Sequence, residues 1–304
     1  MYQVNCAPRT EGMGKEAFLS LLTDKALSCL IDEVTTSPKP GLVDFFSNGS
    51  HCDMDWSLFI KSAHTIVPYL TQMAQLGYDW DGESASLFQA VRFIGIEAEH
   101  AMLRATKGIN THKGALFTLG LLCTASAFVY HDKGYFDGGE VLDFIPQMTC
   151  STLQREFDSL AHKKHLTHGE KLYVDLGEGG IREEAMTGFP TLRKSFFYLQ
   201  FLQTVCHDEN RMNIQVLLVI MSTLFDTNVV SRGGVSGLRW LQKEVNHILL
   251  HGGALCDLSY HALFQLDNAC VQRNISSGGA ADLLSATLFL TRLEKALIAE
   301  PLDF

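Results

Sequence analysis

The chain has 304 residues, 46% of them hydrophobic and 19% charged, and its formal net charge at pH 7 is -10. A chain of this length and composition can bury a large core, and its acidic balance excludes a general nucleic-acid binder, which needs a basic surface. It contains no run of about 18 apolar residues and no basic segment followed by an apolar one at its start, so we expect a cytoplasmic protein without a membrane partner.

Apolar residues recur with a helical period along nearly the whole chain, and the alternation typical of strands is almost absent. The first predicted helix covers 16–36 and ends at the SPKPG segment, 37–41, where two prolines and a glycine stop it. Further helices are predicted, in chain order, over 55–76, 84–107, 113–131, 139–161, 168–176, 190–206, 210–224, 236–250, 252–272 and 279–299. Asp53 or Asp55 can cap the second helix, and 177–193 is predicted to be the longest irregular segment.

These elements predict an all-α fold. No internal repeat or low-complexity tract divides the chain. We therefore expect a single compact multi-helix domain over residues 1–304, with its motifs between about 30 and 290. The functional loops are expected at helix N-termini.

A polar loop follows the first helix and combines a cation with side chains of the kind that bind metal ions. Lys39 lies between two prolines, so a stiff backbone holds this cation close to Gly41. Carboxylates and an imidazole come next, and such oxygen-rich clusters suit Mg²⁺. The candidate metal ligands are Asp44, His51 and Asp53. The alternative is a solvated loop in which an aspartate only caps a helix.

The segment 97–120 ends one helix and begins the next at Lys113. A helix N-terminus exposes unpaired N–H groups and the positive end of the helix dipole, which favours a phosphate. A His112-Lys113 pair at this end is electrostatically unfavourable unless an anion is present, so we predict that Lys113 binds phosphate. For His112, a ligand contact and a buried structural role both stay open. The neighbouring polar candidates are Asn110 and Thr111, as caps, Gly114, and Glu99 one helical face back.

Three further segments place polar residues beside glycines at helix starts. In 177–190, Arg182 can pair with a phosphate or with a glutamate on the surface. In 226–234, Arg232 precedes Gly233 and resembles an anion clamp, because its planar fork binds bidentately. Before the last helix, a serine can cap and the glycines allow a ligand to approach closely. The candidates there are Ser276, Ser277, Gly278 and Gly279. These starts together predict a polyphosphate site, although Walker A and GxGxxG loops are absent.

Six segments resemble, in order and spacing, the motifs of one enzyme family. They are PKPGLVD (38–44), HxDM (51–54), GINTHKG (108–114), GFP (188–190), DTNVVSRGG (226–234) and SSGGAADLL (276–284). The family is that of the triphosphoribosyl-dephospho-CoA synthases, which make the prosthetic-group precursor of citrate lyase and, in a sister branch, of malonate decarboxylase. The last segment departs from the family pattern, since Ser277 stands where a proline tends to precede the glycines.

The resemblance implies an all-helical enzyme that uses ATP and 3′-dephospho-CoA. The 2′-hydroxyl of the dephospho-CoA ribose displaces adenine from C1 of the ATP ribose, and the triphosphate stays on the transferred sugar. The resemblance also implies Mg²⁺ bound with ATP, and a product that passes to a transferase that modifies an acyl carrier protein. A carboxylate is expected to accept the proton of the attacking hydroxyl.

Roles for the candidate residues follow from the motifs and the resemblance together. The predicted substrate-binding residues are Lys39, Gly41, Asn110, Thr111, Lys113, Gly114, Arg182, Arg232, Gly233, Ser276, Gly278 and Gly279. The predicted metal ligands are Asp44, Asp53 and His51. The catalytic candidates are Glu99 or Asp226 as the base, and His112, which could contact phosphate or protonate the departing adenine.

Other functions stay open on the sequence alone. A metal-dependent helical phosphohydrolase would release phosphate from ATP, whereas the transferase releases adenine. A nucleotide sensor or a module that binds an acyl carrier protein would bind ATP without turnover. The choice between citrate lyase and malonate decarboxylase and the oligomeric state, including a homo-oligomer, also stay open.

Overall fold

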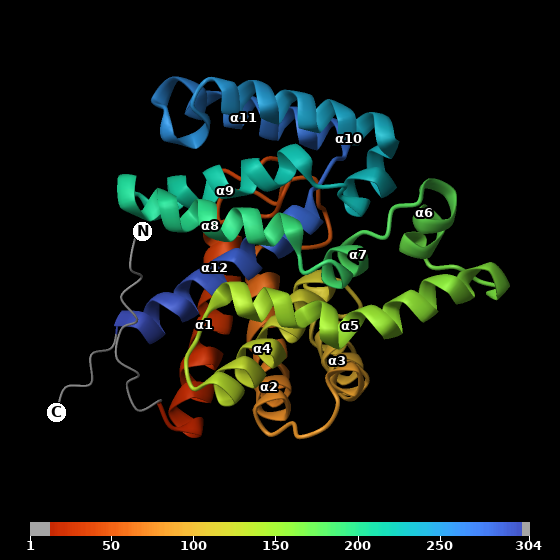
Figure 1. The fold of residues 1–304 in the computed structure, drawn as a ribbon. Helices are drawn as coiled ribbons and strands as arrows, with labels where there is room; N and C mark the ends of the chain where they lie inside the picture. The colour runs from red at the N-terminus through yellow and green to blue at the C-terminus, as the bar shows by residue number, and fades with distance from the viewer. Residues whose placement is uncertain (1–12, 300–304) are drawn as a thin grey trace, which may run out of the picture.

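The computed structural model describes residues 13–299, which fold into twelve α-helices and two short 3-10 helices without a strand (Figure 1). The all-α prediction is thereby confirmed. Residues 1–12 and 300–304 of the predicted domain lie outside the described part. The elements are α1 (Lys15–Thr35), α2 (Trp56–Tyr78), α3 (Ser84–Ala105), α4 (Lys113–Lys133), α5 (Gly138–Ser159), η1 (Leu160–His162), α6 (His168–Leu176), α7 (Ile181–Met186), α8 (Pro190–Val205), α9 (Glu209–Thr223), α10 (Thr227–Leu250), η2 (Gly253–Leu255), α11 (Asp257–Arg273) and α12 (Gly278–Ala299).

Three predicted boundaries were wrong, and the backbone explains each of them. The segment 177–193 is not irregular throughout, because it contains α7 and the first turn of α8. α10 begins at Thr227 rather than 236, because Asp226 caps it there, and it bends at Gly234, whose φ is 66°. α11 begins later than predicted, because two glycines with positive φ come first. The helix start predicted near 236 is therefore the point where one longer helix continues after its bend.

α12 runs through the middle of the molecule and packs against helices on both sides (Figure 1). In that view α1 to α5 lie below it, and α8 to α11 lie above it. Its side chains Leu284, Phe289 and Leu293 are completely buried. Burying a side chain of this size stabilises a fold by about 1.5–3 kcal/mol. The hydrophobic core therefore fixes α12, and with it the polar N-terminus of this helix near the centre of the protein.

α4 is long and apolar enough to cross a membrane, and α9 and α10, bent by 58°, pass the same test as a pair. In this fold 78% of the apolar window of α4 is buried inside the protein. α4 packs against α2, α5 and α12. Its apolar sequence is therefore that of a core helix.

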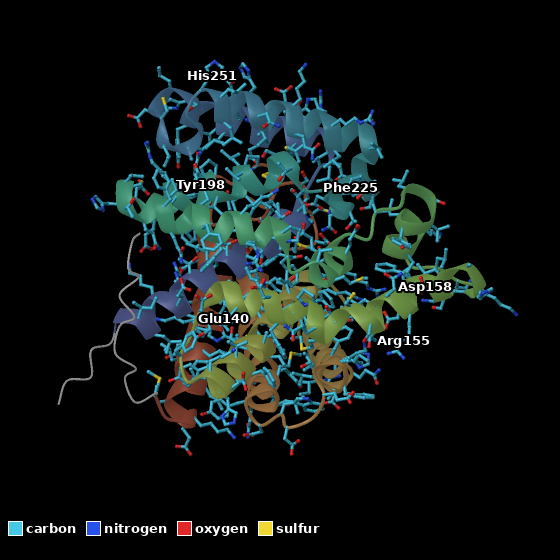
Figure 2. The ribbon with its side chains drawn as sticks, viewed as in Figure 1. Glu140, Arg155, Asp158, Tyr198, Phe225 and His251 are labelled. Atoms are coloured by element: carbon cyan, nitrogen blue, oxygen red, sulfur yellow. The ribbon has the colours of Figure 1, made fainter. Side chains whose placement is uncertain are left out.

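The far end of α5 extends past the other helices toward α6, as Arg155 and Asp158 show in Figure 2. α6 contacts η1 and α10, while α7 packs against α4 and α5. Thr167 begins α6 with a capping box, in which its side chain and Glu170 each bond the other's backbone N–H. These short helices therefore form one wall beside the N-terminus of α4.

One carboxylate joins the N-termini of α10 and α12. Asp226 Oδ1 accepts the N–H groups of Asn228 and Val229 at 2.9 and 3.3 Å. Its Oδ2 accepts the Ser277 hydroxyl at 2.7 Å and the Ala280 N–H at 3.0 Å. The cap of α12 expected from a serine is thus supplied largely by an aspartate of another helix. Since the side chain is completely enclosed, burial raises the pKa of Asp226 although these four donors lower it.

Candidate active site

A cavity of about 570 Å³ opens where the polar segments of the sequence converge. The N-termini of α4, α10 and α12 reach it, together with the α1–α2 loop and the start of α7. Thirteen of the predicted site residues line it: Lys39, His51, Asn110, Thr111, His112, Lys113, Gly114, Arg182, Asp226, Arg232, Ser276, Gly278 and Gly279. The fold therefore gathers residues that are up to 240 positions apart in the chain.

The remaining predicted site residues lie elsewhere. Gly41, Asp44, Asp53 and Gly233 are not part of the cavity wall. Glu99 lines a second cavity, which shares only part of its wall with the first. These five residues therefore do not contact a ligand in the first cavity directly, and their roles must be explained in another way.

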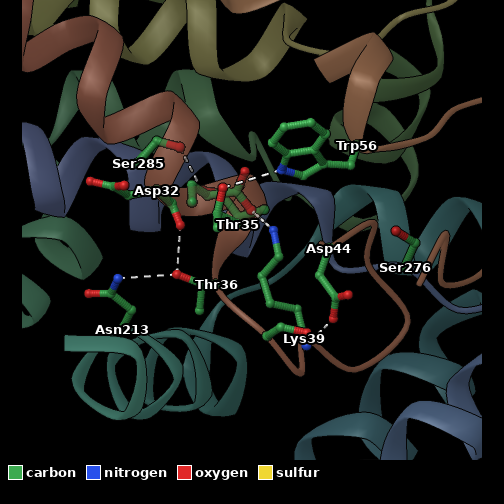
Figure 3. Close-up of polar contacts among 12 residues, drawn as sticks. Asp32, Thr35, Thr36, Lys39, Asp44, Trp56, Asn213, Ser276 and Ser285 are labelled. Atoms are coloured by element: carbon green, nitrogen blue, oxygen red, sulfur yellow. Dashed lines mark hydrogen bonds and ion pairs between the residues drawn. The ribbon is translucent and has the colours of Figure 1, made fainter. Parts of the chain in front are cut away.

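Lys39 and Asp44 organise the α1–α2 loop from within (Figure 3). Lys39 is 1% exposed, and its ammonium forms an ion pair with Glu33 at the end of α1. Asp44 accepts the Lys39 N–H at 3.0 Å with Oδ2, and the N–H groups of Phe46 and Ser47 at 2.8 and 2.9 Å with Oδ1. Burial raises the pKa of Glu33, and the Lys39 charge opposes that rise. Lys39 thus reaches the cavity as a cation that already has one buried partner.

Gly41 has a structural reason to be glycine. Its φ is 73°, and a Cβ there would lie 2.3 Å from the Ile275 carbonyl oxygen. Its N–H donates to Asp267 Oδ1 at 2.8 Å. The residue therefore lets the α1–α2 loop press against the turn before α12, which places Lys39 and Ser276 on one cavity.

Arg232, His51 and Ser276 form a chain of hydrogen bonds along the cavity wall. Arg232 donates to the Ser50 carbonyl oxygen and to Asn274 Oδ1 at 3.0 and 2.9 Å, and to His51 Nδ1 at 3.1 Å. An Nδ1 that accepts leaves the proton on Nε2, which lies 2.9 Å from Ser276 Oγ. Burial, followed by the Arg232 charge, lowers the pKa of His51. The chain leaves the Ser276 hydroxyl proton free to point to a ligand.

The three predicted metal ligands do not converge. Both ring nitrogens of His51 are engaged, and the carboxylate of Asp44 accepts three backbone N–H groups. Asp53 is more than half exposed, and its Oδ1 lies 3.7 Å from His51 Nδ1. Residues 13–299 contain no group of three or more His, Cys, Asp or Glu side chains placed to hold a metal ion. In this structure Asp44 supports the loop and His51 supports Ser276, while the role of the three residues as metal ligands stays a prediction.

The crowding of positive charge predicted at the start of α4 is relieved within the protein. Lys113 Nζ lies 2.6 Å from Glu99 Oε1, in an ion pair at the rim of the second cavity. His112 is 3% exposed, and burial lowers its pKa to about 3, with a smaller contribution from the Lys39 charge. His112 is therefore neutral near pH 7. Asn110 supports the turn by accepting the Lys113 N–H at 3.1 Å.

The tautomer of His112 is set by Ser62 of α2, which the sequence did not single out. Thr111 donates its hydroxyl to Ser62 Oγ at 2.6 Å, and Ser62 Oγ lies 2.8 Å from His112 Nδ1. Ser62 Oγ accepts the Thr111 proton, and we assign its own proton to Nδ1, its remaining hydrogen-bond partner among the described residues. His112 therefore carries its own proton on Nε2, a buried atom without a partner among the described residues. A ligand that accepts this hydrogen bond would remove the cost of leaving it unpaired.

Asp282 is the second residue that the sequence analysis did not single out. It lines the cavity, and its carboxylate lies where a Cβ on Gly114 would be, 1.9 Å from Oδ2. Only glycine at 114 lets this side chain reach the start of α4, where the Ala115 N–H bonds to it. Burial raises its pKa well above the usual range, and the charges of Glu33 and Asp226 add to that rise. The available signal was an aspartate within the apolar SSGGAADLL segment.

The charged side chains on the cavity wall nearly balance. Four are cationic, namely Lys39, Lys113, Arg182 and Arg232, and three are anionic, namely Glu33, Asp226 and Asp282. Arg182 lies 3.9 Å from Glu156 and 3.8 Å from Glu170, which resembles the surface-pair alternative of the sequence analysis. With the helix N-termini added, the wall is a positive region in an acidic protein and suits a polyphosphate.

The chain matches the family "CitG: ATP:dephospho-CoA triphosphoribosyl transferase" over residues 20–300. A Streptococcus equi subsp. equi protein, named "Probable 2-(5''-triphosphoribosyl)-3'-dephosphocoenzyme-A synthase", is 37% identical over 286 residues, covering 90% of this chain and 96% of its own. The synthase of that name from Pectobacterium atrosepticum is 38% identical over 271 residues, covering 88% of each chain. A crystal structure from Archaeoglobus fulgidus, provisionally named a triphosphoribosyl-dephospho-CoA synthase, has a TM-score of 0.47 and 15% identity, covering 77% of this chain and 97% of that one.

The buried neutral state of His112 predicts how stability responds to acid. As pH falls from 6.5 toward about 3, His112 becomes protonated in the unfolded chain but stays neutral in the folded protein. The unfolded state therefore gains stability relative to the folded state, and the free energy of unfolding decreases in this pH range. Lowering the pH from 7 to 5 should reduce the unfolding free energy of the wild-type protein by about 2 kcal/mol through this histidine. The His112→Gln variant should not show this loss. Urea unfolding at both pH values measures the difference. His64→Gln, an exposed change, controls for removing a histidine. Equal losses in wild type and His112→Gln would contradict the buried neutral state.

Proposed function

The chain belongs to the ATP:dephospho-CoA triphosphoribosyl transferase family, and from this premise we propose how its cavity performs the reaction. The enzyme transfers the triphosphoribosyl group of ATP to the 2′-hydroxyl of 3′-dephospho-CoA and releases adenine. The convergence of cations and helix N-termini on one cavity carries the proposal for the site. Such a site can hold a triphosphate through many contacts without breaking it.

The triphosphate is proposed to lie between Arg232, Ser276 and the start of α12. Arg232 uses three of its five N–H donors for hydrogen bonds within the protein, so its other donors can bind phosphate oxygens. The Ser276 hydroxyl and the N–H groups at Gly278 and Gly279 face the same cavity. Lys39 contributes a fixed positive charge, because its ammonium is held by Glu33.

Asp282 is proposed as the general base in place of Glu99 or Asp226. Glu99 lies outside the first cavity and is paired with Lys113, while Asp226 is engaged by four donors. Asp282 lines the cavity, and its raised pKa makes it a stronger proton acceptor. It would take the proton of the acceptor 2′-hydroxyl as that oxygen bonds to C1 of the ATP ribose. The C1–N9 bond breaks, its electron pair leaves with adenine, and adenine gains a proton in the net reaction.

His112 is proposed to hold adenine or phosphate by a hydrogen bond from Nε2. Its low pKa leaves no imidazolium near neutral pH, so it does not deliver the proton that adenine gains. A neutral donor held in one tautomer by Ser62 still orients an acceptor atom. This assigns His112 a positioning role toward the leaving group or the triphosphate.

Mg²⁺ is proposed to arrive with ATP rather than to reside in the protein. Mg²⁺ usually binds substrate phosphates, waters and one or two carboxylates. Glu33 is a carboxylate on the wall that caps no helix and could complete its ligands. Mg²⁺ alone should therefore leave the melting temperature of the protein unchanged, whereas Mg²⁺ with ATP should raise it. A rise with Mg²⁺ alone would contradict this and favour a protein metal site.

We assign the product to citrate lyase rather than malonate decarboxylase, because the matching family carries the CitG name. The product is proposed to pass in the cytoplasm to a separate transferase that modifies the acyl carrier protein. Loading of the citrate lyase carrier but not the malonate decarboxylase carrier, in a coupled assay with that transferase, would support the assignment.

The triphosphate assignment predicts the effect of removing Arg232. Arg232→Gln should raise the KM for ATP about tenfold or more, since one charge-assisted phosphate contact contributes about 1.5–3 kcal/mol. Arg239→Gln, an exposed change on the same helix, should leave that KM unchanged. Adenine release from ATP, Mg²⁺ and dephospho-CoA, followed by chromatography, measures both. Release of phosphate without adenine in wild type would instead indicate a phosphohydrolase.

The base assignment predicts a second kinetic result. Asp282→Asn should lower kcat about 10²–10⁴-fold with little change in the KM for ATP, the usual range for a lost general base. In wild type, kcat/KM should fall as pH decreases through the raised pKa of Asp282, because the protonated acid accepts no proton. Asp143→Asn, at an exposed ion pair, serves as the control. Retained kcat in a folded Asp282→Asn enzyme would overturn the assignment.

A further inference from the structure

A second cavity of about 520 Å³ adjoins the first and is not explained by ATP binding. It lies between α3, α4, the end of α5, η1 and α6. Within residues 13–299, only Lys113 and Arg182 line both cavities. A molecule that fills the second cavity would therefore meet a ligand of the first at these two cations.

The inner wall of the second cavity is apolar. Phe88, Val91 and Ile96 face it from α3, and Leu116, Phe117 and Leu121 from α4. Ile96 is 45% exposed, so part of this apolar wall is open to a ligand. Gly95 leaves space in the same wall, whereas Met73 Sδ packs against Gly120. The interior therefore suits an uncharged, largely aliphatic chain.

The rim of this cavity carries a ring of ion pairs with one excess cation. Arg92, Lys113, Lys163 and Arg182 face Glu99, Glu156 and Glu170. Lys113 lies 2.6 Å from Glu99, and Lys163 lies 2.7 Å from Glu170. The Lys113–Glu99 pair is partly exposed, and such pairs contribute only about 0–1 kcal/mol, so a phosphate can replace Glu99 as the partner of Lys113 at little cost. The rim can thus bind an anionic group beside the apolar interior.

We propose that this second cavity binds the pantetheine arm of dephospho-CoA, with the diphosphate of that substrate at Lys113 and Arg182. The assignment rests on the proposed function, because the reaction brings the ribose of dephospho-CoA to the ribose of ATP. The acceptor must carry its arm out of the first cavity, and the arm consists of an uncharged aliphatic and amide chain attached to a diphosphate. An apolar cavity with cations on the shared wall matches that order of groups.

This proposal assigns Lys113 a more specific role than the phosphate binding predicted from the sequence. Its position on both walls places it between the triphosphate of one substrate and the diphosphate of the other. Glu99 becomes its partner in the absence of dephospho-CoA, which explains a carboxylate outside the first cavity. The segment that begins α4 then serves both substrates.

Filling the second cavity tests the proposal. A Cβ on Gly95 would touch only Met73 Cε, at 3.6 Å, so Gly95→Leu extends into the cavity without a backbone clash and favours the α3 helix. It should raise the KM for dephospho-CoA at least tenfold and leave the KM for ATP within twofold of wild type. Gln89→Leu, an exposed change on α3 outside both cavities, should change neither.

A fragment separates this proposal from the overall reaction. At saturating ATP, 4′-phosphopantetheine should inhibit wild type competitively against dephospho-CoA, and this inhibition should weaken at least tenfold in Gly95→Leu. Equal rises in both KM values, or inhibition by the fragment that competes with ATP, would overturn the cavity assignment. Unchanged dephospho-CoA kinetics, as expected if another molecule occupies the cavity, would overturn it too. If the proposed function itself were wrong, the wild-type protein would release no adenine.

Discussion

The shape of the first cavity depends on one buried carboxylate, that of Asp226. It accepts donors at the start of its own helix, α10, and at the start of α12, where Ser277 and Ala280 lie 51 and 54 positions further along the chain. A buried carboxylate without partners would cost several kcal/mol, so its four donors determine how closely the two helix starts approach. Gly279 permits this approach, since a Cβ there would lie 3.1 Å from Asp226 Oδ2. The position that an anionic ligand could occupy at these helix ends is thus filled in part by the protein itself.

The cations of the site differ in how firmly the protein holds them. Lys39 and Glu33 form a buried pair, and removing either partner would leave an uncompensated charge inside the protein. Lys113 and Arg182 are partly exposed, and the Lys113–Glu99 pair is of the kind that exchanges its partner easily. A positive charge that is fixed in place can orient a triphosphate before binding. Cations with replaceable carboxylates can follow a second substrate as it enters, and the two kinds lie on one wall.

Much of the fold and the membership of the site could be predicted from the sequence. The helical period is a local property, and glycines beside caps mark helix ends, so the boundaries near Lys113 and Gly278 were accessible. What the sequence could not show depends on loop conformation and on contacts between distant segments. The hydrogen-bond partners of Asp44 and His51, which are backbone N–H groups and Arg232, are set in this way. The charge of His112 is a matter of burial, and its tautomer depends on Ser62, fifty residues away.

Two adjoining cavities also answer a problem that this chemistry poses. The oxocarbenium-like centre of a glycosyl transfer can be captured by water as well as by the acceptor hydroxyl. An enzyme favours the acceptor when binding energy from remote parts of the substrate holds the reacting group in place. The apolar wall of α3 and α4 lies on the far side of Lys113 and Arg182 from the first cavity, where it can supply that energy. Anchoring the arm there places the 2′-hydroxyl at the shared wall, so the acceptor itself excludes the water that would compete with it.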